Sequence, residues 1–145
     1  MDRPAFDVQE AGKVTTPGHN ATINFTRLTT LARETVAATQ ARLPAAVRAP
    51  AAEVPVHLAA VPGDDLLNEG FEPDILGLFT GPAHGDERGA DNLLPPQIFL
   101  YLDNLWDFAD GDVAVFRKEV RLTYLHELGH YLGWDEDDLV ARGLD

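Results

Sequence analysis

Apolar residues recur every three or four positions in two segments of the chain, which is the spacing of a helix with one buried side. The first segment predicts a helix over about 26–42. Asn24 or Thr26 would cap its start, and Pro44 would end it. The apolar positions that define this helix are Phe25, Leu28, Leu31, Val36 and Leu43.

The second segment predicts the longest helix of the chain. It begins after a capping Asp112 and ends near Tyr131, where Gly133 can adopt the left-handed backbone that terminates a helix. Its apolar positions are Val113, Phe116, Val120, Tyr124 and Leu128. A final short helix over Glu136–Arg142 follows, with Asp135 as its cap.

Three short segments have the pattern of β-strands. Apolar and other residues alternate from Val54 to Ala60, and Pro55 places this strand at a sheet edge or at its own start. Residues 75–80 are a second candidate. Residues 97–102 are strongly apolar, which predicts a central strand.

The remaining segments connect these elements. One helical turn is expected over 64–69 and a short helix over 104–109, whereas 45–53 reads as a connector. Residues 81–94 form a long loop without periodicity, which in a small domain is usually functional or mobile. Residues 1–21 are polar and predict a flexible leader.

The order of elements predicts an α+β fold in which a sheet of about three strands packs on the long helix.

Composition restricts the class of protein. With 45% hydrophobic residues, residues 22–145 are expected to form a single globular domain. The net charge of −13 would repel nucleic acid, so no nucleic-acid partner is expected. The chain shows neither a signal peptide nor an apolar run of membrane-spanning length, and it has no cysteine. We therefore expect a cytoplasmic monomer without a membrane partner.

The motif that carries chemistry is His126-Glu-Leu-Gly-His130 on the long helix. Residues four apart lie about 40° from each other around a helix, so both imidazoles can bind one zinc ion. Glu127 lies to one side of that face, where it can act as general base towards a zinc-activated water. The apolar flanks predict that this part of the helix is largely buried. A chance histidine pair on a solvated helix is the alternative.

A catalytic zinc usually has three protein ligands and one open position. Gly133 lets the chain turn back after the helix, which places Glu136 where a third ligand would lie. Asp137 is the alternative, because a shift of one residue in the turn would exchange the two. Both could instead be acidic residues that favour a helix N-terminus.

Several other polar side chains could contribute to a site. Tyr101, Tyr131 and His84 could stabilise an oxyanion, although a structural role or an exposed position is the better expectation for each. His57 is out of phase with the apolar positions of its strand and should face solvent. The segment 75–80, beside the glycine-rich loop, is a hypothetical edge for binding an extended peptide.

The sequence resembles the small bacterial zincin-like metallopeptidases with the pattern HExxHxxGxxE/D. The resemblance is most specific over residues 126–139, HELGHYLGWDEDDL, and is supported by residues 95–106 and 75–81. It extends over about 26–145. It implies a minimal zincin-like domain, a single zinc ion and peptide or protein substrates.

The sequence differs from better-known zincins in its third ligand. Metzincin-like enzymes have histidine at the position of Glu136 and a methionine-containing turn, but Met1 is the only methionine here. Thermolysin-like enzymes take a glutamate from a later helix, and no glutamate follows Glu136.

Three functions remain open from the sequence. The first is a zinc metallopeptidase that uses Glu127 as general base, with His126, His130 and Glu136 as zinc ligands. The second is a metal-binding or protein-interaction module with a zincin-like site and little or no turnover. The third is a zinc hydrolase of a non-peptide amide. Glu127 favours catalysis, because metal binding alone needs no base beside the ligands.

Overall fold

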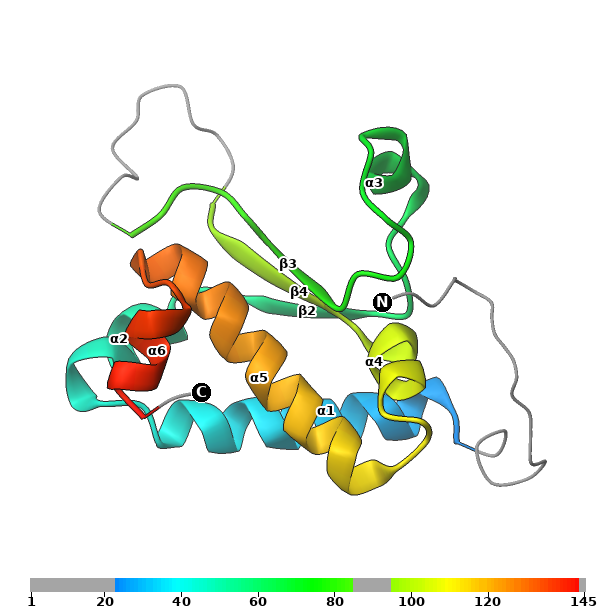
Figure 1. Ribbon diagram of the computed structural model, residues 1–145, viewed down its shortest axis with the longest axis horizontal. Coiled ribbons are helices and arrows are strands. Elements are labelled where there is room, and N and C mark those ends of the chain that lie inside the picture. Colours follow the sequence, from blue (N-terminus) through cyan, green and yellow to red (C-terminus); the bar gives the residue numbers. More distant parts are fainter. Residues whose placement is uncertain (1–22, 85–94, 144–145) are drawn as a thin grey trace.

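The computed structural model describes residues 23–84 and 95–143, which form a three-stranded sheet with helices packed against it (Figure 1). The predicted α+β class is confirmed. The elements in chain order are α1 (Phe25–Ala41), α2 (Ala45–Ala52), β2 (Val56–Ala59), α3 (Asp64–Asn68), β3 (Gly77–Thr80), β4 (Gln97–Tyr101), α4 (Leu102–Phe108), α5 (Val113–Leu132) and α6 (Glu136–Ala141). The predicted leader over 1–21 and residues 85–94 of the predicted loop lie outside the described residues.

The sheet has the strand order β2-β4-β3, so β4 is central as predicted. β2 runs parallel to β4, and β3 runs antiparallel to it. Pro55 precedes β2 at the sheet edge, where its carbonyl accepts a hydrogen bond from the Ile98 N–H at 3.0 Å. β3 begins at Gly77, two residues later than predicted.

The two faces of the sheet differ in character. Ile98 and Leu100 of β4 are fully buried and belong to the hydrophobic core. Phe99 lies between them in sequence and points to the opposite face, as strand geometry requires. There it stacks on His57 of β2, with ring centroids 4.9 Å apart. The core therefore lies on one face of the sheet, beneath the helices.

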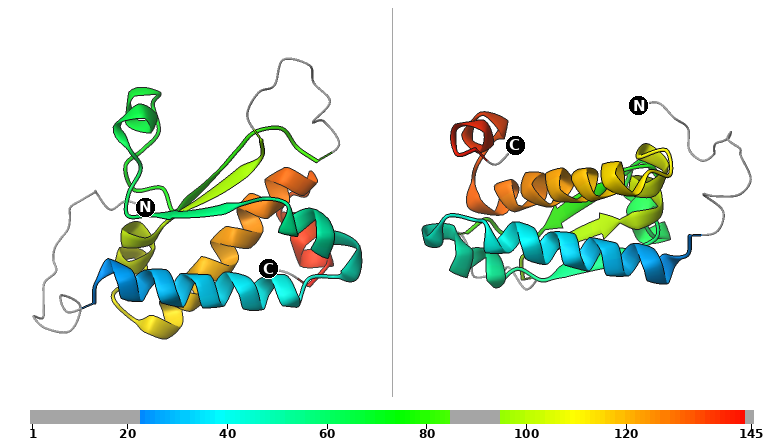
Figure 2. Two further views of the ribbon diagram at one scale, coloured as in Figure 1. Left: turned by 180° about the vertical axis from the view of Figure 1, so that it is seen from behind. Right: turned by 90° about the horizontal axis from the view of Figure 1, so that it is seen from below.

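α5 packs on β3 and β4, and α1 packs beside α5 (Figures 1 and 2). Phe116, Val120 and Tyr124 form the buried side of α5. The Tyr124 hydroxyl accepts a hydrogen bond from Gln40 of α1 at 3.0 Å, which joins the two helices. No helix in the described ranges has both the length and the apolar character to span a membrane.

The predicted helix caps agree with the structure. The Asn24 side chain accepts a hydrogen bond from the Arg27 N–H at 2.9 Å, which decides between Asn24 and Thr26. Asp112 accepts one from the Val115 N–H at 3.0 Å. Gly133 ends α5 with φ 77°, a left-handed conformation that favours glycine.

The prediction of a connector over 45–53 is wrong, because residues 45–52 form α2. Alanine has the highest helix propensity, and this segment is mostly alanine. Pro50 lies inside the helix and removes one backbone donor, but burial of Ala51 and packing of Val47 against the core offset that loss. α4 also begins at Leu102, directly after β4 and earlier than predicted.

Candidate metal centre

His126 and His130 lie on successive turns near the C-terminal end of α5. Their rings meet edge to face, with centroids 4.9 Å apart and an interplanar angle of 89°. The prediction that both point to one side of the helix is confirmed. The prediction that this side is buried is wrong for the histidines, because both are exposed. Their apolar neighbours in sequence face the core instead, and the histidines occupy the adjoining flank.

Glu127 lies between the histidines in sequence but is buried, with only 8% of its surface exposed. Its carboxylate accepts a hydrogen bond from the Phe79 N–H of β3. Burial raises the pKa of Glu127, and the charge of His126 and the Phe79 hydrogen bond partly oppose this increase. Glu127 is therefore a desolvated carboxyl group held between α5 and the sheet.

Gly77 is what allows β3 to approach α5 so closely. A Cβ atom at this position would lie 2.6 Å from Thr123 Cγ2, 3.0 Å from the Phe99 carbonyl oxygen and 3.3 Å from Glu127 Cγ. The sequence prediction treated Gly77 only as part of a strand and missed this contact. A glycine inside a strand is a signal for close approach, although it does not identify the neighbour.

The pKa of His130 is lowered, first by burial and then by the charge of His126. Two imidazolium rings this close repel each other, so the neutral form of His130 is favoured. The neutral imidazole is the form that binds a metal. The electrostatics of the pair and its geometry therefore both suit a divalent cation.

The two histidines supply only part of a zinc site. Among the described side chains, no group of three His, Asp or Glu residues is placed to hold a metal, and Asp137 does not complete one with the histidine pair. The Glu136 side chain lies outside that description, so its role stays a prediction. Imidazole nitrogens are nonetheless among the donors that zinc prefers.

After α5 the chain turns back against the helix that it has just left. The Trp134 N–H donates to the Gly129 carbonyl at 2.7 Å, within the turn at Gly133. A Cβ atom on Gly129 would lie 3.2 Å from the Trp134 carbonyl oxygen. The glycine between the two histidines of the motif thus leaves room for the returning chain.

The start of α6 is held by a capping box. Asp135 accepts a hydrogen bond from the Asp138 N–H at 2.8 Å, and Asp138 accepts one from the Asp135 N–H at 3.0 Å. Farther along, the Arg142 guanidinium lies 4.1 Å above the ring centroid of Trp134. These contacts set the backbone position of Glu136, the first residue of α6.

The other predicted side chains lie in different surroundings. Tyr131 is buried, and its hydroxyl is 3.0 Å from the ring nitrogen Nδ1 of His84. The backbone N–H of His84 also donates a hydrogen bond to the backbone carbonyl of Tyr131. Tyr101 is buried, and burial and the charge of Glu127 raise the pKa of its phenol. His57 is exposed as predicted, with Nε2 2.7 Å from the Gln97 side-chain oxygen.

Comparison with known proteins relates this chain to one protein family. A sequence profile of zincin-like metallopeptidases matches residues 51–144, which is more than half of the 145 residues. The matched range contains the sheet, α5 and α6. No curated protein matches the chain.

Proposed function

This chain belongs to the zincin-like metallopeptidase family, and on that premise we propose that it is a zinc-dependent peptidase. His126, His130 and Glu136 are the zinc ligands, and Glu127 is the general base. One observation carries the proposal: a buried carboxyl group with a raised pKa lies next in sequence to one of two paired, exposed imidazoles on one helix. This combination is typical of a hydrolytic site.

Each residue has a distinct part in hydrolysis. Bound zinc supplies a Lewis acid that polarises the substrate carbonyl and acidifies water. His126 and His130 would hold the zinc through ring nitrogens, and Glu136 would add a carboxylate oxygen. The Glu127 carboxylate takes a proton from the attacking water and passes it to the nitrogen of the leaving amine. The raised pKa of Glu127 brings its proton affinity closer to neutral pH, which suits both transfers.

The free edge of β3 is the proposed binding site for an extended peptide. The Tyr101 N–H donates to the Leu76 carbonyl at 3.0 Å, and pairing alternates along antiparallel strands. Gly77 and Phe79 therefore direct their backbone polar groups away from β4. No strand within the described residues pairs with that edge. The Phe79 N–H already donates to Glu127, so an added peptide would pair with the Gly77 N–H and with the Gly77 and Phe79 carbonyls, and it would lie beside Glu127.

A module that only binds metal is less consistent with the burial of Glu127. Removing a carboxylate from water is unfavourable, and neither histidine needs it for metal binding. A base for the attacking water does require a carboxylate at this place. We therefore favour catalysis over simple metal binding.

The test compares the wild type with Glu127→Gln, and uses Glu119→Gln on the same helix as a matched control. Zinc content is measured for each protein, followed by cleavage of a peptide library. We expect similar zinc content in all three proteins, and a loss of cleavage of about 10²–10⁴-fold in Glu127→Gln alone. Equal cleavage by wild type and Glu127→Gln would refute the general base. A zinc-loaded wild type that cleaves no peptide would favour the metal-binding module.

A further inference from the structure

A groove of about 440 Å³ lies between α1 and α5. It is lined by Glu34, Thr35, Ala38 and Thr39 of α1, by Arg42 directly after that helix, by Arg117, Lys118, Arg121 and Leu125 of α5, and by Gly143. Arg121 and His130 are nine residues apart, so they point about 180° apart around α5. The groove is therefore on the other flank of the helix from the histidine pair.

The charge of the groove is opposite to that of the protein. Arg42, Arg117, Lys118 and Arg121 contribute four of the 11 Lys and Arg residues of the chain. Glu34 is the single acidic residue among the described residues of the lining, and these residues together carry a formal charge of four minus one, or +3. The whole chain carries −13. A local cationic groove in so acidic a protein creates a specific attraction for anions.

The floor and the walls of the groove differ. Thr35, Thr39 and Leu125 are buried and form the floor. The hydroxyls of Thr35 and Thr39 donate to backbone carbonyls of their own helix, each at 2.8 Å. Hydrogen-bond donors for a ligand must therefore come from the cationic side chains of the walls.

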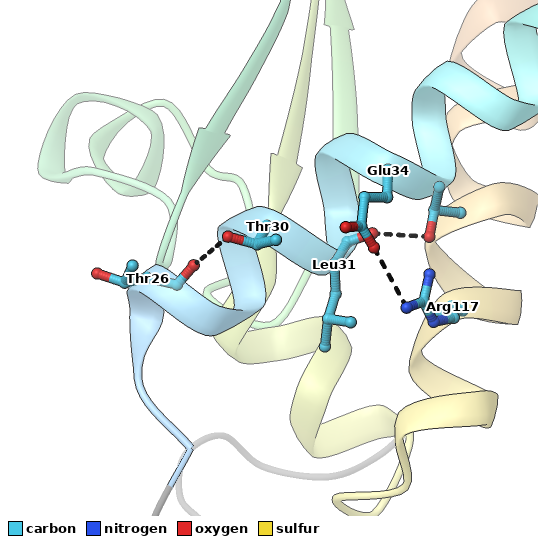
Figure 3. Close-up of polar contacts among 6 residues, drawn as sticks. Thr26, Thr30, Leu31, Glu34 and Arg117 are labelled. Atoms are coloured by element: carbon cyan, nitrogen blue, oxygen red, sulfur yellow. Dashed lines mark hydrogen bonds and ion pairs between the residues drawn. The ribbon is translucent and has the colours of Figure 1, made fainter.

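The contact between Glu34 and Arg117 does not neutralise the groove. These side chains form an ion pair at 3.3 Å across the space between α1 and α5 (Figure 3). They are 56% and 42% exposed, respectively. Exposed ion pairs contribute little free energy, so a ligand with a denser negative charge can compete for Arg117.

We propose that this groove binds a small anion that carries phosphate or carboxylate groups. Its volume lies within the range of about 300–1,000 Å³ that small-molecule sites have. Guanidinium groups bind both kinds of anion through paired hydrogen bonds, and three arginines line the walls. The proposal does not depend on the peptidase activity, because the groove and the histidine pair occupy different flanks of α5.

The test is calorimetric titration of the metal-free full chain with pyrophosphate and, separately, with citrate at constant ionic strength. The groove variant is Arg42→Gln/Arg121→Gln. The control is Arg27→Gln/Arg33→Gln, which removes the same charge from α1 outside the groove. We expect saturable binding of at least one anion, weakened at least about tenfold in the groove variant and less than about twofold in the control.

The two anions distinguish a phosphate ligand from a carboxylate ligand. Lys118→Gln, at an exposed position, is a second groove variant in case the double variant does not fold. Absence of saturable binding for both anions would overturn the proposal. So would equal weakening in the groove and control variants, because that result indicates general attraction to positive charge.

Discussion

The Glu127 carboxylate accepts a hydrogen bond from the Phe79 N–H, so α5 and the edge strand β3 are joined at the carboxyl group proposed as general base. Glu127 is consequently oriented by the sheet, although its neighbours His126 and His130 are exposed. The proposed base and the proposed peptide-binding edge are therefore one structural unit. A change in the packing of β3 on α5 should alter catalysis as well as stability.

Replacement of Glu127 by glutamine should stabilise the metal-free protein at neutral pH. Folding raises the pKa of Glu127, so its favourable contribution is complete below the unfolded-state pKa and is lost as pH rises through the folded-state pKa. Glutamine has no such dependence. The free energy of unfolding of Glu127→Gln relative to wild type should therefore increase with pH across that window. Urea denaturation in chelator at several pH values measures it.

The control for this experiment is Glu119→Gln, which makes the same exchange on α5 at a less buried position. Its carboxylate keeps more of its water, so a smaller change is expected. If Glu127→Gln is less stable than wild type throughout the pH range, Glu127 contributes to the fold as a charged group, contrary to our interpretation.

Replacement of Gly77 by alanine should disturb the junction of β3 and α5. The added Cβ would lie 2.6 Å from Thr123 Cγ2 and 3.0 Å from the Phe99 carbonyl oxygen. Such overpacking costs about 1–3 kcal/mol of unfolding free energy. Because Glu127 Cγ is also within 3.3 Å, kcat should fall more than zinc affinity. Thermal denaturation, zinc titration and peptide cleavage separate these effects.

Gly63→Ala is the matched control, because nothing lies within 4 Å of a Cβ at that position. It should leave kcat unchanged, and its effect on stability should be limited to the loss of a preferred N-cap residue of α3, at most about 1 kcal/mol. Thr123→Ser in the Gly77→Ala background removes the nearest methyl group and should restore part of the stability. Wild-type activity in Gly77→Ala would contradict the positioning role of this glycine.

Removal of either histidine should abolish stabilisation by zinc. With free zinc at about 100 times the dissociation constant, binding adds about 2.7 kcal/mol to the free energy of unfolding. His126→Ala and His130→Ala should lose this increase, whereas His57→Ala, on the sheet, should keep it. Thermal denaturation with and without chelator measures the difference. Equal zinc stabilisation in all three variants would exclude the proposed site.

Removal of the α6 cap tests the third ligand. Asp135→Ala loses the capping box, which should cost about 1 kcal/mol of stability. Because Glu136 follows directly, zinc affinity should also fall. Asp112→Ala removes the comparable cap of α5, far from the histidines in sequence, and should lower stability without a similar loss of zinc affinity. Equal zinc affinity in the two variants would argue against Glu136 as a ligand.

Much of this fold follows from local sequence patterns. The caps Asn24 and Asp112, the terminating Gly133 and the central position of β4 all agree with prediction, because each depends on residues near one another in the chain. The prediction of a connector over 45–53 is wrong because the structure of this segment depends on distant parts of the chain. Its helix is supported by burial of Ala51 in a core that distant elements complete.

The spacing of His126 and His130 was sufficient to predict that their rings share a side of α5, since helix geometry alone relates residues four apart. Burial of Glu127 and exposure of its neighbours depended instead on where β3 packs. That contact requires Gly77, some fifty residues earlier in the chain, and the cationic groove likewise requires α1 beside α5. Periodicity specifies directions around one helix, whereas the environment met in each direction comes from segments that tertiary packing brings together.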